Sequence, residues 1–305
     1  MAFTQIADIF SPEVLGDQVS ARFPDMLVLG NTNLVEVDST FALGSPGTKF
    51  TMPFWKRIST FAPLTEGTAM TPGKVTTGKE NATVQRAGLA LEVLDTAELV
   101  SKADPVGEIA DQIARRAAEY IDASLVFQLG NTPNTFDQTT TANKAATGST
   151  NGTANQNTYI AAMTATVGDN FMKLLSGGKL IMHSKVYGDL VQTGAIQNQY
   201  QSGENVIQTG MIPTLMGLPI ILSDLVSVVS ASTIKYQSYI VGPGALALFY
   251  QRQVMVEFDR DILLLADVIS SNVHFAPHLF GWDDVTNTVV AEQNKSIHAV
   301  SVTTF

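Results

Sequence analysis

The feature that most constrains this chain is the segment 104–129, whose pattern predicts one long amphipathic helix. Asp104 can cap the N-terminus, and Pro105 suits the first helical position, where a missing N–H costs nothing. Apolar residues recur at close to helical spacing, namely Ile109, Ile113, Ala117, Tyr120, Ile121, Leu125 and Leu129. Charged residues lie largely off that stripe, namely Arg115, Arg116, Glu119 and Asp122. At about 1.5 Å per residue the helix is about 40 Å long.

The chain before this helix begins with an arm, residues 1–46. A short helix is expected over Pro12–Arg22, with Ser11 as its N-cap, and Phe23-Pro24 breaks it. The extended chain that follows carries apolar residues but little helical periodicity. Such a segment needs another surface to lie on.

Residues 47–96 predict a long hairpin. One limb is Thr48–Ile58, in which Pro53 indicates an edge position or a bulge, and the return limb is roughly Ala82–Thr96. Between them, Thr65–Asn81 is rich in Thr, Gly, Lys and Pro, which predicts a wide tip rather than a tight turn. Because two-stranded ribbons are marginally stable alone, this one is expected to rest on a neighbouring element or subunit.

The chain after the helix predicts a mixed α/β region and then a mainly β region. Residues 131–158, dominated by Thr, Asn, Gly, Ala and Gln, are expected to form a surface loop. A helix is expected over Tyr159–Leu175, and a second, capped by Ser184, through about Gln192. Strands are expected at 179–183, 217–223, 236–241, 254–258 and 272–276, with a turn at Gly242-Pro243-Gly244.

Composition narrows the function classes. Only 15% of the 305 residues are charged, against roughly 25% in ordinary domains, which favours a surface covered by partners. The net charge of −10 argues against a DNA-binding module, because such binding rests on Lys and Arg neutralising phosphates. The absence of cysteine excludes disulfides and thiolate sites. No signal peptide and no apolar run of membrane-spanning length is recognised.

The histidines offer the main alternative, a metal-dependent hydrolase. His274 and His278 are four residues apart, a spacing that on a helix places both on one face. Pro277 lies between them and the surroundings predict a strand, so a metal pair is disfavoured. No nucleophile elbow and no phosphate-binding loop is present. No catalytic, metal or cofactor-binding residue is therefore assigned, and no cofactor is expected.

The order of these parts resembles the major capsid proteins of tailed bacteriophages, an α+β fold of the Hong Kong 97 type. Local phrases carry the same resemblance, in family order: Ala117–Leu125, Leu180–Leu190, Thr214–Asp224, and Glu257–Asp261 followed by His274–Trp282. The resemblance implies five parts: an N-arm (1–46), an E-loop hairpin (47–96), a P domain with its spine helix and following loop (97–158), an A domain (159–250), and a return to the P domain sheet with a C-terminal β segment (251–305).

The resemblance also implies partners. Copies of the chain are expected to assemble into hexamers and pentamers of an icosahedral head shell, made in the host bacterial cytoplasm. The shell encloses double-stranded DNA without sequence-specific binding and without a membrane. Because Met1 is followed almost directly by the arm, either scaffolding is a separate protein or this is the mature form of the chain, and the initiator Met favours a separate scaffolding protein. A portal and a decoration or cement protein are further expected partners. An encapsulin-type nanocompartment shell and, less strongly, a secreted adhesin remain alternative interpretations.

The resemblance places the hairpin on a neighbouring subunit. The expected inter-subunit contacts are Phe54, Trp55, Ile58, Phe61, Glu66, Lys74 and Lys79, acting through strand pairing and apolar contact. Some relatives join subunits by a Lys–Asn isopeptide bond in this hairpin. No matching Asn and acid are identified for Lys74 or Lys79, so no crosslink is assigned.

Overall fold

The computed structural model describes residues 19–24, 26–30, 32–38, 47–56, 58, 63, 66–67, 69–70, 72–94, 105–166, 174–193, 214–226, 228–230, 234–261, 266–290 and 299–305. The predicted long helix is α3 (Pro105–Leu129). Asp104, its expected cap, and most of the expected Pro12–Arg22 helix lie outside the described residues, although 19–24 are helical. None of the helices in the described ranges is both long and apolar enough to cross a membrane.

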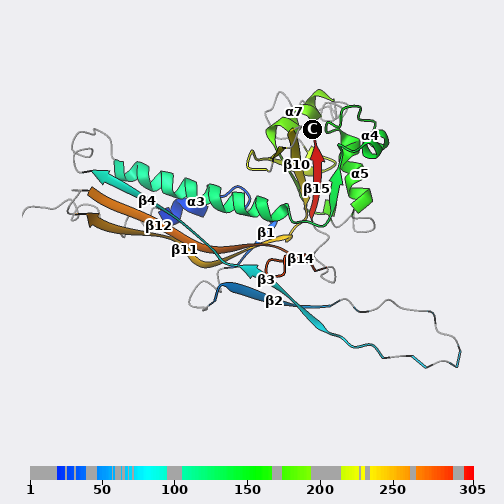
Figure 1. Cartoon of the computed structure of the whole chain (residues 1–305), viewed down its shortest axis with the longest axis horizontal. Helices are drawn as coiled ribbons and strands as arrows, with labels where there is room; N and C mark the ends of the chain where they lie inside the picture. Colours follow the sequence, from blue (N-terminus) through cyan, green and yellow to red (C-terminus); the bar gives the residue numbers. More distant parts are fainter. Residues whose placement is uncertain are drawn as a thin grey trace, which may run out of the picture.

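Helix α3 lies along a four-stranded sheet (Figure 1). The strand order is β1 (Val35–Asp38), β11 (Leu246–Asp261), β12 (Ala266–Leu279) and β4 (Gln85–Leu94), with β1 parallel to β11 and the other pairs antiparallel. On β12, alternate residues Ile269, Val273 and Phe275 are buried in one core with α3 residues such as Ile113 and Ile121. Because strand side chains alternate between faces, Ser270, Asn272 and His274 lie on the face away from α3.

A second body adjoins the C-terminal end of α3 (Figure 1). Its sheet has the order β5 (Thr135–Asp137), β15 (Ala299–Thr304), β10 (Ile234–Val241), β6 (Lys179–Met182), β8 (Leu218–Leu222) and β7 (Thr214–Leu215), with β9 (Val228–Ser230) also paired to β10. The helices α4 (Thr141–Thr147), α5 (Gln156–Thr166) and α7 (Ser184–Gln192) belong to this body. Its core buries Tyr159, Met163, Leu190 and Ile240.

The third part is a two-stranded ribbon of β2 (Lys49–Trp55) and β3 (Thr77–Thr83), which projects from the four-stranded sheet (Figure 1). The prediction that the return limb Ala82–Thr96 pairs with the first limb of the hairpin is wrong. Strand β3 pairs with β2, whereas β4 joins β12 and belongs to the four-stranded sheet. Only Val84 separates β3 from β4, so one extended stretch serves two sheets.

The expected surface loop at 131–158 is instead structured, and its polar residues are the reason. Thr140 Oγ1 accepts the Asn143 N–H at 3.4 Å at the start of α4, and Gly148 ends that helix with φ of 72°. Asn155 Oδ1 accepts the Thr158 N–H at 2.8 Å at the start of α5. The Thr and Asn side chains that suggested low complexity are therefore helix caps and turn formers.

Two further local expectations change. Ser184 is not the cap of α7: His183 Nδ1 accepts the Lys185 N–H at 3.0 Å, and the Ser184 N–H is bound by Asp224. The expected helix Tyr159–Leu175 begins earlier, at Gln156, and continues to Thr166. Residues 167–173 lie outside the described part of the chain.

The five-part division stays a prediction, and the sheets supply two facts that bear on it. Thr135–Asp137, expected in the P domain, is a strand of the same sheet as β10. Ala299–Thr304, the expected C-terminal β segment, pairs with β10 in that sheet as well. The four-stranded sheet receives β11 and β12, as the predicted return of the chain requires.

Candidate assembly interface

The β2–β3 ribbon carries the residues predicted to contact a neighbour. Lys56 donates its N–H to Thr76 O at 2.9 Å, and Val84 to Thr48 O at 3.0 Å. Because antiparallel partners alternate, even-numbered residues of β2 turn their backbone groups toward β3 and odd-numbered residues turn them outward. Pro53 therefore lies at an outward position, where it removes a donor from the free edge of β2. This edge is poorly suited to adding a strand, so side-chain contact becomes the better basis for docking.

The apolar side chains of the ribbon do not form one surface. Trp55 is 69% exposed and Ile58 67% exposed. Phe54 is half-buried and lies over Gly78, where an added Cβ would come within 2.5 Å of the Phe54 ring. Beyond the ribbon, Met70 and Val75 are also exposed, at 74% and 62%. Phe61 lies outside the described residues.

The ribbon is positively charged. Lys49, Lys74 and Lys79 are exposed, as is Glu66, the one exposed acid among the described residues between β2 and the end of β3. The register pairs Lys49 with Thr83, Pro53 with Lys79 and Trp55 with Thr77. Lys49, Lys79 and Trp55 therefore share one face of the ribbon. That these residues touch a neighbouring subunit remains a prediction.

The other face of the ribbon is held to its own subunit by apolar contact. Phe50 and Ala82 are buried against Phe249 and Ala276 of the four-stranded sheet. The rings of Phe50 and Phe249 lie 5.7 Å apart between centroids. This packing fixes the root of the ribbon and leaves its far end to extend away from the subunit (Figure 1).

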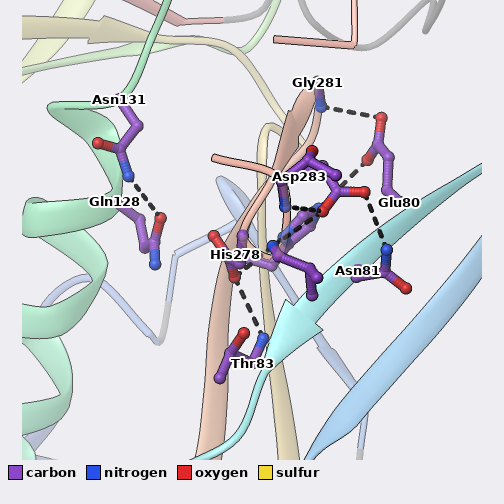
Figure 2. Close-up of polar contacts among 11 residues, drawn as sticks. Glu80, Asn81, Thr83, Gln128, Asn131, His278, Gly281 and Asp283 are labelled. Atoms are coloured by element: carbon purple, nitrogen blue, oxygen red, sulfur yellow. Dashed lines mark hydrogen bonds and ion pairs between the residues drawn. The ribbon is translucent and has the colours of Figure 1, made fainter. Parts of the chain in front are cut away.

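A buried polar cluster lies beside that packing, at the root of the ribbon (Figure 2). Glu80 of β3 and His278 of β12 are both fully buried. Glu80 Oε2 lies 3.2 Å from His278 Nε2, and Glu80 Oε1 accepts the Gly281 N–H at 3.2 Å. Asp284 Oδ2 lies 3.8 Å from His278 Nδ1 and accepts the Thr83 N–H at 3.2 Å. We call Glu80, His278 and Asp284 the root cluster.

A second set of bonds surrounds the root cluster. Asn81 Nδ2 donates to Asp283 Oδ2 at 2.9 Å (Figure 2). Thr51 Oγ1 donates to Asn81 Oδ1 at 2.8 Å. Asp283 Oδ1 accepts the N–H groups of Val285 and Thr286. Burial raises the pKa of Asp283, but the donors from Thr286, Val285 and Asn81 outweigh it and lower the pKa overall. Asp283 is therefore held as an ion that ties β3 to the turn after β13 (Trp282–Asp283).

Sequence reasoning did not find the root cluster. From the sequence, His278 is considered only as a metal ligand with His274, and Glu80 falls within the Thr65–Asn81 tip, to which no buried role is assigned. His274 lies instead on the half-exposed part of β12. Within the described ranges no group of three or more His, Cys, Asp or Glu is placed to hold a metal ion. The available signal was a Glu inside an otherwise polar strand and a His inside an apolar one; neither identifies its partner.

The face of the four-stranded sheet away from α3 has its own charge pattern. The register aligns Glu92 of β4, Val268 of β12 and Asp259 of β11 in one row across the sheet. Glu92 and Asp259 are exposed and Val268 is half-buried. Nearer the ribbon, Arg252 is paired with Glu257 at 2.8 Å. We call this face of the four-stranded sheet, which lies away from α3 and carries the row Glu92, Val268 and Asp259, the outer sheet face.

The chain resembles known proteins in family and in fold. A family model described as phage capsid protein matches residues 77–279, more than half of the chain. The capsid of cyanophage Pam1 is 11% identical with a TM-score of 0.65, covering 93% of this chain and 91% of that one. The capsid of Ralstonia phage GP4 is 10% identical with a TM-score of 0.63, covering 90% and 88%. A chain from Mycobacterium phage Che8 is 16% identical with a TM-score of 0.60, covering 88% and 89%. No curated protein matches the chain.

Proposed function

Because the chain belongs to the phage capsid protein family, we propose that it assembles with further copies of itself into hexamers and pentamers of an icosahedral head shell. The observation that carries the proposal is the ribbon. Its root is anchored in the subunit, while Trp55, Ile58, Met70 and Val75 are left exposed by the rest of the described chain. Several exposed apolar side chains on one projecting element are typical of an interaction site.

The outer sheet face of a second copy is the docking surface that fits the ribbon best. The ribbon presents Trp55 beside Lys49 and Lys79, and the outer sheet face presents Val268 between Glu92 and Asp259. Apolar contact flanked by opposite charges gives both affinity and register. Docking through side chains also agrees with the outward position of Pro53, which disfavours strand addition.

The remaining parts follow from this assembly. Within the expected arm (1–46), β1 is held in the subunit's own four-stranded sheet, so it is the remaining part of the arm that embraces another subunit. Residues 159–250 with their neighbouring strands meet at the centre of a hexamer or pentamer. The shell encloses double-stranded DNA in the virion and is built in the host bacterial cytoplasm. A separate scaffolding protein, a portal and a decoration or cement protein assist assembly. The family favours this role over an encapsulin-type compartment, and a structural role requires no catalytic site.

Removing residues 57–75, the far end of the ribbon, tests the proposal and leaves the root of the ribbon intact. Residues 57–75 are replaced by Asn-Gly, because Lys56 and Thr76 form a hydrogen-bonded pair that a two-residue loop can close. We expect subunits that fold with unchanged thermal stability but form no closed shells, as seen by electron microscopy and sedimentation. Normal shells from this variant would show that the ribbon tip is not the assembly element.

A further inference from the structure

The root cluster places both nitrogens of one imidazole against carboxylates. His278 Nε2 faces Glu80 at 3.2 Å, and His278 Nδ1 faces Asp284 at 3.8 Å, an ion-pair distance rather than a hydrogen bond. A neutral imidazole carries one N–H and one lone pair, so one of its nitrogens would direct a lone pair at a carboxylate oxygen. Only the doubly protonated ring matches both neighbours.

The surroundings of His278 reinforce this requirement. From β3 the charged group that faces it is Glu80, and from the turn after β13 it is Asp284. Asp283, beside Asp284, directs its carboxylate to Asn81 and to backbone N–H groups (Figure 2). The neighbour of His278 on β11 is Ala247, and the ring of Phe280 packs edge-on against it at 5.6 Å. Among the described residues named around this site, the His278 ring is thus the one group that can carry a positive charge. The acids beside it are Glu80, Asp284 and, further off, Asp283.

The cluster also occupies the position from which the ribbon could move. Glu80 lies on the ribbon, His278 on the four-stranded sheet, and Asp284 on the turn that also binds Thr83 N–H and donates its own N–H to Asn81 O. The single residue Val84 connects the ribbon to β4. A change at the cluster therefore acts where a small rotation shifts the far end of the ribbon most.

We propose that the root cluster is a proton-operated latch: protonated His278 bridges Glu80 and Asp284 and fixes the ribbon, and loss of that proton releases it. The proposal rests on the proposed role of the ribbon in assembly, because that role gives the released state a consequence. Solution pH then sets how firmly each subunit holds the ribbon at the angle needed to meet its neighbour.

The direction of the pH effect follows from linkage. Burial lowers the pKa of His278, but the carboxylates of Asp284 and Glu80 outweigh it and raise the pKa above its ordinary 6.5. A raised folded-state pKa means that the stabilisation is fully present below pH 6.5. It is lost as the pH rises from 6.5 through the higher folded-state value.

The test is hydrogen exchange in the unassembled full-length subunit, followed between pH 5.5 and 9 at the amides of Gly281 and Thr83. These amides donate to Glu80 and Asp284 and so report opening of the latch directly. After correction for intrinsic base catalysis, we expect their protection to fall by up to about tenfold per pH unit above 6.5 and then level off. Val302 of β15, buried in the second body, is expected to show no such fall.

Two variants separate the latch from general histidine effects. His278→Gln is expected to give low protection at Gly281 that no longer depends on pH. His274→Gln, four residues earlier and half-exposed, is expected to behave as the unchanged chain. If His278→Gln does not fold, NMR titration of His278 in the unchanged chain decides instead. A pKa above 6.5 supports the latch, and a lower value overturns it.

Failure of the latch can be told apart from failure of the proposed assembly role, because hydrogen exchange is measured in the unassembled subunit. Equal pH dependence in the unchanged chain and His278→Gln overturns the latch even if removal of residues 57–75 abolishes shells. Conversely, a titrating latch in a chain whose tip is dispensable for shells leaves the latch standing and removes its role in assembly.

Discussion

Replacing Asp122 by alanine is expected to lower the free energy of unfolding by about 3–5 kcal/mol. Asp122 lies on α3 and is buried, with Oδ2 accepting the Val28 N–H at 2.8 Å and Oδ1 accepting those of Leu29 and Gly30 at 3.2 Å each. Hydrogen bonds to a charged group contribute roughly 1.5–3 kcal/mol each, and buried donors left without an acceptor add to the loss. Because the three hydrogen bonds share one carboxylate, the expected loss is smaller than the sum of three independent hydrogen bonds.

The measurement is urea denaturation of the subunit, with two comparison variants. Asp122→Asn keeps one carbonyl oxygen but sets an N–H₂ group against a donor, so an intermediate loss is expected. Asp111→Ala removes an exposed carboxylate of the same helix, paired with Arg22, and should cost less than about 1 kcal/mol. Equal losses for Asp122→Ala and Asp111→Ala would mean that the 28–30 segment is not held by Asp122.

Reversing charge on the ribbon is expected to prevent assembly, and reversing it on the outer sheet face is expected to restore it. Lys49→Glu with Lys79→Glu places acids against Glu92 and Asp259 of the neighbour, and like charges in contact cost several kcal/mol. We expect a roughly tenfold or greater fall in the fraction of chain found in shells. Raising the salt concentration should soften the effect, because exposed charges are screened.

The decisive comparison adds Glu92→Lys and Asp259→Lys to the same chain. Because every copy then carries both reversed surfaces, attraction returns and shells are expected to recover. Lys144→Glu, on α4 in the second body, is the control and should assemble normally (Figure 1). Failure of the fourfold variant to recover, with each variant folded, would place the docking surface elsewhere.

Local patterns predicted much of the fold correctly. Helix α3 was expected from its apolar spacing and Pro105, and strand β6 with helix α7 from an apolar run followed by a helical pattern. The hairpin was expected from alternation and turn residues, and β2 and β3 form it. Each of these signals lies within a few residues of the element that it predicts.

The errors arose where the deciding partner is distant in sequence. The choice of β4 to pair with β12 rather than β2 depends on residues about 180 positions away (Gly88 and Asn272 are register partners). Asp122 looked like a surface residue of the helix because nothing local announces the 28–30 segment that covers it. The root cluster joins residues about 200 positions apart, so no local pattern brings Glu80, His278 and Asp284 together.

The most direct test of the account is electron cryomicroscopy of particles formed by the full-length chain, expressed alone and with its neighbouring phage genes. We expect closed icosahedral shells in which Trp55 and residues 57–75, which include Ile58, lie on the outer sheet face of an adjacent subunit. Subunits that stay monomeric under all these conditions, or shells in which each ribbon contacts only its own chain, would contradict it.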